Sequence, residues 1–132
     1  MKMISDFIVV DDDIINNMIC SKIIRHVLTG AKVLTFTEPE AALTYIQSKY
    51  ANENAAMVIL LLDINMPSMD GWEFLDAFQQ FDQGIKSHFK IYMLSSSVDL
   101  RDRERAISNE NVTSYLEKPF TIENLKAIMN AE

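Results

Sequence analysis

The chain has 132 residues, of which 48% are hydrophobic and 23% charged, and its formal net charge is −7. These values fit one globular domain over residues 1–132, and no apolar run reaches the roughly 20 residues that cross a bilayer. The negative charge argues against direct contact with nucleic acid, which needs a footprint of Lys and Arg. The first residues lack the apolar segment of a signal peptide, and the lone Cys20 cannot form an internal disulfide. We therefore expect a cytoplasmic protein.

Short β-rich runs alternate along the chain with segments of helical periodicity. The expected strands cover residues 7–10, 31–36, 57–62, 90–94 and 112–116. The expected helices begin near Asp13, after Pro39, near Gly71, near Val98 and after Thr121. This alternation indicates βαβ units, and it predicts an α/β, doubly wound fold with a parallel sheet and helices on both faces.

The first expected helix runs from about Asp13 until Gly30 stops it. Its apolar residues recur every fourth position and predict an apolar stripe, made of Ile15, Ile19, Ile23 and Val27 and widened by Met18 and Ile24. The opposite side would carry Asn16, Asn17, Ser21, Lys22 and Arg25. The second helix follows Thr37-Glu38-Pro39-Glu40, which has the spacing of a capping box.

Polar side chains follow the expected strands at the points where they end. They are Asp11 and Asp12, Asp63, Ser95 and Lys118. In a parallel sheet these ends meet at one edge, where open α/β folds place their ligand sites. An Asp that only ends a strand or caps a turn is the ordinary alternative at any one position, but it does not account for the whole set.

The residue types at this edge suit phosphoryl transfer. Carboxylates held together without a cation repel by roughly 4 kcal/mol per close pair at an effective dielectric near 20. Mg²⁺ relieves this repulsion and suits a site with few carboxylates and several waters. Lys118 and Ser95 can each donate to a phosphate oxygen. A carboxylate nucleophile, Mg²⁺, Lys and Ser together indicate phosphoryl transfer to Asp63.

Taken together, these segments resemble the receiver domain of two-component response regulators over nearly the whole chain. The resemblance rests on four motifs in order: 9–12 (VVDD), 62–71 (LDINMPSMDG), 93–96 (MLSS) and 115–120 (YLEKPF). It implies a (βα)5 flavodoxin-like fold with a five-stranded parallel sheet in the order 2-1-3-4-5. It also implies a cis bond between Lys118 and Pro119.

The resemblance further implies a role for each matching residue. Asp63 would accept the phosphoryl group, and Lys118 and Ser95 would bind it. Ser95, in place of the more common Thr, and Tyr115 would form the switch pair. The other implied roles are Asp11, Asp12, Asp63 and the Asn65 carbonyl as ligands of Mg²⁺, with Mn²⁺ as a substitute, Asp13 as the residue that starts the helix, and Asn65 and Ser97 as positions that tune dephosphorylation.

The implied function is that of a phosphoacceptor in a phosphorelay. A sensor histidine kinase or histidine phosphotransfer protein would donate the phosphoryl group, and slow self-dephosphorylation would end the signal. The domain would catalyse only these reactions on itself and would not turn over external substrates. Phosphorylation would switch the surface formed by the fourth helix, fifth strand and fifth helix for an unidentified protein target, without contact to a membrane.

Several alternatives remain at this stage. A phosphatase of the haloacid dehalogenase class also uses an Asp nucleophile, although such enzymes have an acidic residue at the position that Asn65 occupies in this chain. A binding module that works without phosphorylation is another alternative. Tyr115 could be an ordinary strand aromatic, and the charges of 98–108 a solvated face. We expect His26 and His88 to be helix and loop-surface residues. The chain could be a stand-alone regulator, which Met1 favours, or part of a larger one.

Overall fold

The computed structural model describes residues 4–51, 57–96 and 99–130. Its five strands form one parallel sheet in the order β2-β1-β3-β4-β5. The strands are β1 (Ile4–Val10), β2 (Lys32–Phe36), β3 (Met57–Asp63), β4 (Phe89–Ser95) and β5 (Val112–Glu117). The predicted fold class and strand order are therefore confirmed.

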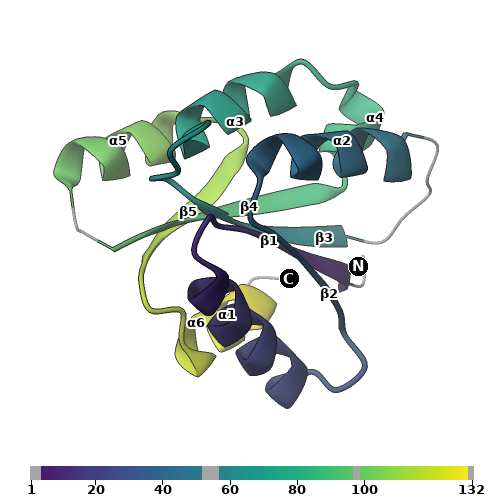
Figure 1. Ribbon diagram of the computed structural model, residues 1–132, viewed down its shortest axis with the longest axis vertical. Coiled ribbons are helices and arrows are strands. Elements are labelled where there is room, and N and C mark those ends of the chain that lie inside the picture. Colours follow the sequence, from purple (N-terminus) through teal and green to yellow (C-terminus); the bar gives the residue numbers. More distant parts are fainter. Residues whose placement is uncertain (1–3, 52–56, 97–98, 131–132) are drawn as a thin grey trace.

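Helices cover both faces of this sheet. They are α1 (Ile14–Val27), α2 (Pro39–Lys49), α3 (Gly71–Gln79), α4 (Gln83–Lys86), α5 (Leu100–Ser108) and α6 (Ile122–Asn130). Figure 1 shows α1 and α6 on one side of the sheet and α2, α3, α4 and α5 on the other. The sequence did not predict α4, because a single turn of helix is too short to display a periodicity. Among the described residues, no helix has both the length and the apolar character to cross a membrane.

Each face of the sheet has its own hydrophobic core, because successive strand residues point to opposite sides. In the central strand β3, Leu60 and Leu62 pack toward the α2 and α3 side, whereas Ile59 and Leu61 pack toward α1 and α6. The strand is buried on both faces, as its unbroken apolar run predicted. This burial fixes Asp63 at the carboxyl end of the sheet.

The first half of α1 contradicts the predicted orientation. Ile15 and Met18 are exposed by 64% and 53%, together with Ile14 and Ile19. The buried side instead consists of Asn16, Asn17, Cys20, Ser21 and Ile24. The buried stripe is thus displaced by one residue, and only the second half of the helix packs its apolar residues as expected. The physical reason is that the first turns of α1 lie beside polar strand ends that need hydrogen-bond donors.

Two turns differ in how they start a helix. Glu38 precedes α2 without a side-chain cap, so the predicted capping box at residues 37–40 is wrong. A complete capping box stands before α3 instead, between Asp70 and Glu73. The next residue, Gly71, approaches the strand so closely that a Cβ there would lie 2.8 Å from the backbone oxygen of Asp63. Glycine therefore lets α3 begin directly against the end of β3.

Candidate functional site

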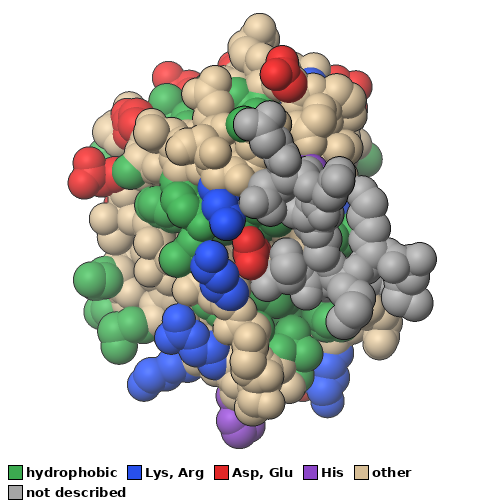
Figure 2. All heavy atoms as spheres, turned by 90° about the vertical axis from the view of Figure 1, so that its right-hand side faces the viewer, with side chains coloured by type: hydrophobic (Ala, Val, Ile, Leu, Met, Phe, Trp, Pro, Cys, Tyr) green, Lys and Arg blue, Asp and Glu red, His purple; other side chains and the backbone are tan. Residues whose placement is uncertain are grey.

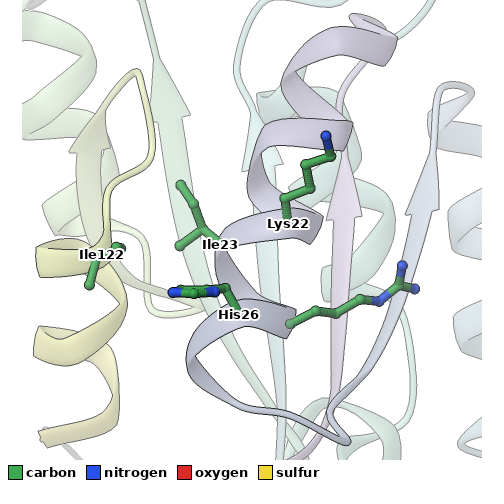
Figure 3. A pocket seen from close by; sticks show the side chains of 5 residues that line it. Lys22, Ile23, His26 and Ile122 are labelled. Atoms are coloured by element: carbon green, nitrogen blue, oxygen red, sulfur yellow. The ribbon is translucent and has the colours of Figure 1, made fainter.

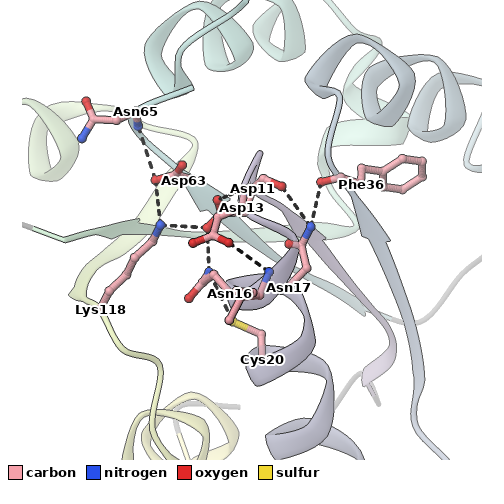
Figure 4. A network of polar contacts seen from close by, with 10 residues as sticks. Asp11, Asp13, Asn16, Asn17, Cys20, Phe36, Asp63, Asn65 and Lys118 are labelled. Atoms are coloured by element: carbon pink, nitrogen blue, oxygen red, sulfur yellow. Dashed lines mark hydrogen bonds and ion pairs between the residues drawn. The ribbon is translucent and has the colours of Figure 1, made fainter. Parts of the chain in front are cut away.

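The ammonium group of Lys118 bridges two buried carboxylates at the carboxyl edge of the sheet (Figure 4). Its Nζ lies 2.8 Å from Oδ2 of Asp11 and 3.2 Å from Oδ1 of Asp63. Asp11 is 1% exposed and Asp63 is 3% exposed. The three residues come from the ends of β1, β3 and β5, so the structure brings together side chains that the sequence separates by more than one hundred positions.

Other donors besides Lys118 also bind Asp11. The backbone N–H of Asp13 donates to Oδ1 at 2.9 Å, and the Asn16 amide donates to Oδ2 at 2.6 Å. Asn17 donates to the backbone oxygen of Asp11 at 2.9 Å and to that of Phe36 at 3.4 Å. Asp13 itself caps α1 by accepting from the N–H of Ile15, as its implied role predicts. Sequence reasoning missed both asparagines, although two adjacent residues that favour caps over helix interiors were a signal.

The electrostatics of the site follow from burial and from this crowding of charge. The pKa of Asp63 is raised to about 7, first because burial penalises its charged form and second because Asp11 lies nearby, while Lys118 opposes both effects. Burial lowers the pKa of Lys118, but its contacts with Asp11 and Asp63 together outweigh burial and hold that pKa above its ordinary value. Burial, followed by the charge of Asp11, also raises the pKa of the Cys20 thiol to about 12.

The acidic residues can also hold a metal ion. Asp11, Asp12 and Asp63 each offer one carboxylate oxygen, and these oxygens all lie within 4.8 Å of one another. Asp12 is exposed, whereas the other two are buried, so the cluster opens toward solvent on one side. Three carboxylate oxygens in this arrangement match the oxygen ligands that Mg²⁺ prefers. The residues therefore fit the cation that the sequence predicted.

The other candidate residues lie around this cluster at different depths. Asn65 is exposed, and its backbone N–H lies 3.4 Å from Oδ1 of Asp63. Ser95 is buried at the end of β4, and its backbone oxygen accepts from the N–H of Lys118 at 2.8 Å. Tyr115 is buried in the core on the α2 and α3 side. Ser97 lies outside the described residues. The Lys118-Pro119 bond is cis, which confirms that prediction.

Both histidines lie away from the cluster. His26 is exposed and lines a groove between α1 and α6 together with Lys22, Ile23, Arg25 and Ile122 (Figure 3). In Figure 2, most of the visible Lys and Arg side chains lie from the middle of the face downward, toward the level that α1 and α6 occupy in Figure 1. His88 is 8% exposed, so its expected surface position is wrong. Its backbone oxygen accepts from the N–H of Val58 at 2.7 Å, and this bond draws the residue into the sheet.

Comparison with known proteins agrees with this arrangement. The model of the response regulator receiver domain family matches residues 7–130. A two-component response regulator from Cytophaga hutchinsonii has a similar crystal structure, with a TM-score of 0.87 and 34% identity, over 99% of this chain and 97% of that one. A response regulator receiver protein from Dyadobacter fermentans also gives a TM-score of 0.87, at 27% identity and with 98% and 97% of the two chains covered.

A curated relative adds information on length. The heme response regulator HssR of Staphylococcus epidermidis is 29% identical over 123 residues, which is 93% of this chain and 48% of HssR. The chain thus spans about half the length of that relative. Because the family model matches nearly every residue from the first strand to the last helix, the chain belongs to the response regulator receiver domain family.

Proposed function

We propose that residues 1–132 act as one cytoplasmic receiver domain that accepts a phosphoryl group on Asp63 from a phosphohistidine of a partner protein. Receiver domains are signalling domains and not turnover enzymes. The observation that carries the proposal is the bridge from Lys118 to Asp11 and Asp63. It joins a buried carboxylate nucleophile to a cation that can bind the transferred phosphoryl oxygens.

The proposed reaction is a displacement at phosphorus. A carboxylate oxygen of Asp63 attacks, the O–P bond forms as the P–N bond of phosphohistidine breaks, and the electron pair returns to the imidazole nitrogen, which takes up a proton. Lys118 turns from its two carboxylate partners toward the phosphoryl oxygens, and the Ser95 hydroxyl donates to another. Water later displaces the Asp63 carboxylate from phosphorus and releases inorganic phosphate.

Asp11, Asp12, Asp63 and the backbone carbonyl of Asn65 are the proposed Mg²⁺ ligands. A bound cation would neutralise negative charge on the oxygens of the phosphoryl group that is transferred. Asp63 has a pKa of about 7 without a metal, so a part of the carboxyl groups is protonated near neutral pH. The positive charge of Lys118 favours the ionised form that can attack. Asn65, exposed beside Asp63, and Ser97 are the proposed positions that tune the later hydrolysis.

The outward side of α1 supports docking of a protein partner. Its first turns expose four large apolar side chains, which we name the α1 apolar face: Ile14, Ile15, Met18 and Ile19. This helix begins directly after Asp13, next to the carboxylate cluster. A phosphohistidine can reach Asp63 only if its protein covers the rim of the site. Exposed apolar residues at that rim favour a folded protein over a small molecule as the donor.

The proposed output is a change in α5, β5 and α6, which are the fourth expected helix, the fifth strand and the fifth expected helix. Phosphorylation adds about 1.5 to 2 negative charges, and new hydrogen bonds to Ser95 and Lys118 contribute about 1.5 to 3 kcal/mol each. Two such bonds total roughly 3 to 6 kcal/mol, and a shift from 1:99 to 99:1 needs about 5.5 kcal/mol. Ala106 is the residue that α5 buries fully, whereas Leu100 and Ile107 are exposed. With so little apolar burial, α5 can move at small cost.

The direct test is phosphorylation of the purified protein with acetyl phosphate and Mg²⁺, followed by intact mass measurement. We expect the wild type to gain one phosphoryl group and Asp63→Asn to gain none. Asp76→Asn is the matched control, because Asp76 is an exposed carboxylate on the neighbouring helix α3. It should be phosphorylated as fully as the wild type.

Two outcomes would contradict the proposal. One is a wild type that gains no phosphoryl group while the control reaction, in which a known receiver domain is treated in the same way, succeeds. The other is equal phosphorylation of Asp63→Asn and the wild type. The first outcome would favour a binding module that works without phosphorylation, and the second would move the acceptor to a different residue.

A further inference from the structure

We infer that Asn16 is a positioning residue for Asp11: its side-chain amide fixes the carboxylate in the orientation that a divalent cation needs. It also remains bonded to Asp11 when Lys118 turns toward a phosphoryl group. The inference rests on the proposed function. Asn16 lies outside the set of residues that the sequence motifs indicate, on the buried side of α1.

The geometry is a shared oxygen. Oδ2 of Asp11 accepts from the Asn16 amide at 2.6 Å and from Lys118 Nζ at 2.8 Å, while Oδ1 accepts from the backbone N–H of Asp13. Asn16 is 7% exposed and Asp11 is 1% exposed. The bond from the Asn16 amide comes from the first turns of α1, and the bond from the N–H of Asp13 comes from its cap. The start of the helix therefore holds one carboxylate by both of its oxygens (Figure 4).

Lys118 and Asn16 differ in how permanent their bonds to Asp11 can be. Lys118 is shared between Asp11 and Asp63, and in the proposed reaction it leaves both for phosphoryl oxygens. A buried carboxylate that loses a charged donor pays a large desolvation penalty unless another donor stays. Asn16 is neutral, and within the described part of the chain its amide contacts no second carboxylate, since its other contact is with Sγ of Cys20 at 3.8 Å. It can therefore keep Asp11 oriented without repelling a bound cation.

Asn17 supplies an internal comparison. It is the next residue, of the same type and also buried, but its amide donates to backbone oxygens of Asp11 and Phe36 and not to the carboxylate. Loss of either amide removes a buried hydrogen bond from the same turn of α1. Only the loss of Asn16 removes a donor from an atom of the carboxylate that would bind the cation.

The experiment is calorimetric titration of Mg²⁺ into wild type, Asn16→Leu and Asn17→Leu in the absence of any phosphodonor. Removing a hydrogen-bonding partner of a metal ligand typically weakens metal affinity by about 10- to 100-fold. We expect a loss of that size for Asn16→Leu and a change of less than about 3-fold for Asn17→Leu. Asn16→Ala, which also lacks the donor but adds no bulk, should reproduce the loss, and thermal unfolding would establish that each variant is folded.

The possible results separate this inference from the function on which it rests. Wild-type affinity in folded Asn16→Leu or Asn16→Ala would overturn the inference and leave the magnesium site standing. An equal loss in Asn17→Leu would also overturn it, because the effect would then belong to helix packing. A wild type that binds no Mg²⁺ would overturn the proposed magnesium site and this inference with it.

Discussion

The guanidinium of Arg105 lies over the ring of Trp72, with its carbon 4.4 Å from the ring centroid. This cation–π contact joins α5 to the first turn of α3. Trp72 is largely buried, whereas Arg105 lies at the surface. The contact therefore ties a helix that buries little apolar surface to the part of the fold that begins directly against Asp63.

We expect Arg105→Ala to lower the free energy of unfolding by about 0.5 to 1 kcal/mol, the value of such contacts at exposed sites. Trp72 is the single tryptophan of the chain, so its fluorescence can follow urea unfolding and report its own surroundings. Arg103→Ala, at an exposed position on the same helix, is the control and should stay within about 0.5 kcal/mol of wild type. Equal effects of the two substitutions would remove the special role of the Trp72 contact.

The second prediction concerns pH and uses metal-free protein. The pKa of Asp63 is about 7 in the folded state, above the ordinary value of 3.8 for an Asp carboxyl, so between these two pH values the folded protein keeps a proton that the unfolded chain has released. The contribution of Asp63 to the free energy of unfolding must therefore fall as the pH rises from about 4 to about 7. Because each pKa unit corresponds to about 1.4 kcal/mol, the upper limit is roughly 4 kcal/mol.

Asp63→Asn removes this titration and isolates it from other groups. The variant should match wild type near pH 4, become progressively more stable than wild type up to about pH 7, and keep a constant advantage above that pH. Chemical denaturation in buffer with a chelator, repeated at several pH values, would measure the difference. A difference that does not depend on pH would show that Asp63 titrates as it does in the unfolded chain.

The third prediction concerns the α1 apolar face. We expect Met18→Asp to slow phosphoryl transfer from a phosphohistidine donor protein by at least about 10-fold, because 1.4 kcal/mol of lost binding suffices for that change. Reaction with acetyl phosphate needs no protein docking and should stay near the wild-type rate. Ile107→Asp, which changes another exposed apolar residue, on α5, is the matched control. If both variants lose transfer alike, α1 is not the docking surface.

The sheet could be predicted from the sequence because its pattern is strong and local. The run from Met57 to Leu62 is long, unbroken and apolar, which is typical of a strand buried on both faces, and the structure buries Val58 to Asp63 accordingly. The orientation of α1 could not be predicted in the same way. Periodicity counts apolar residues, but the side that the helix turns inward depends on polar groups of Asp11, which lies just before the helix, and of Phe36, 19 residues beyond Asn17.

The candidate site, like the fold, could be predicted from the sequence only in part. Acids and Lys at strand ends carry a clear signal, and the structure brings Asp11, Asp63 and Lys118 into contact. Asn16 carries a much weaker signal, because an asparagine on a helix is ordinarily a surface residue. His88 was placed at the surface because a polar residue in a loop is usually exposed, whereas its backbone continues the pairing of β3 and β4.

The single-residue offset along α1 has a consequence for how signalling pathways diverge. The positions that hold the reactive cluster, 16 and 17, and those that face outward, 14, 15, 18 and 19, alternate on one helix without overlapping. If the α1 apolar face docks the phosphodonor as proposed, substitutions on the outward set after duplication of such a regulator would separate one copy from the phosphodonor of the other. The chemistry at Asp63 would be inherited unchanged, so crosstalk could be reduced without any loss of signalling capacity.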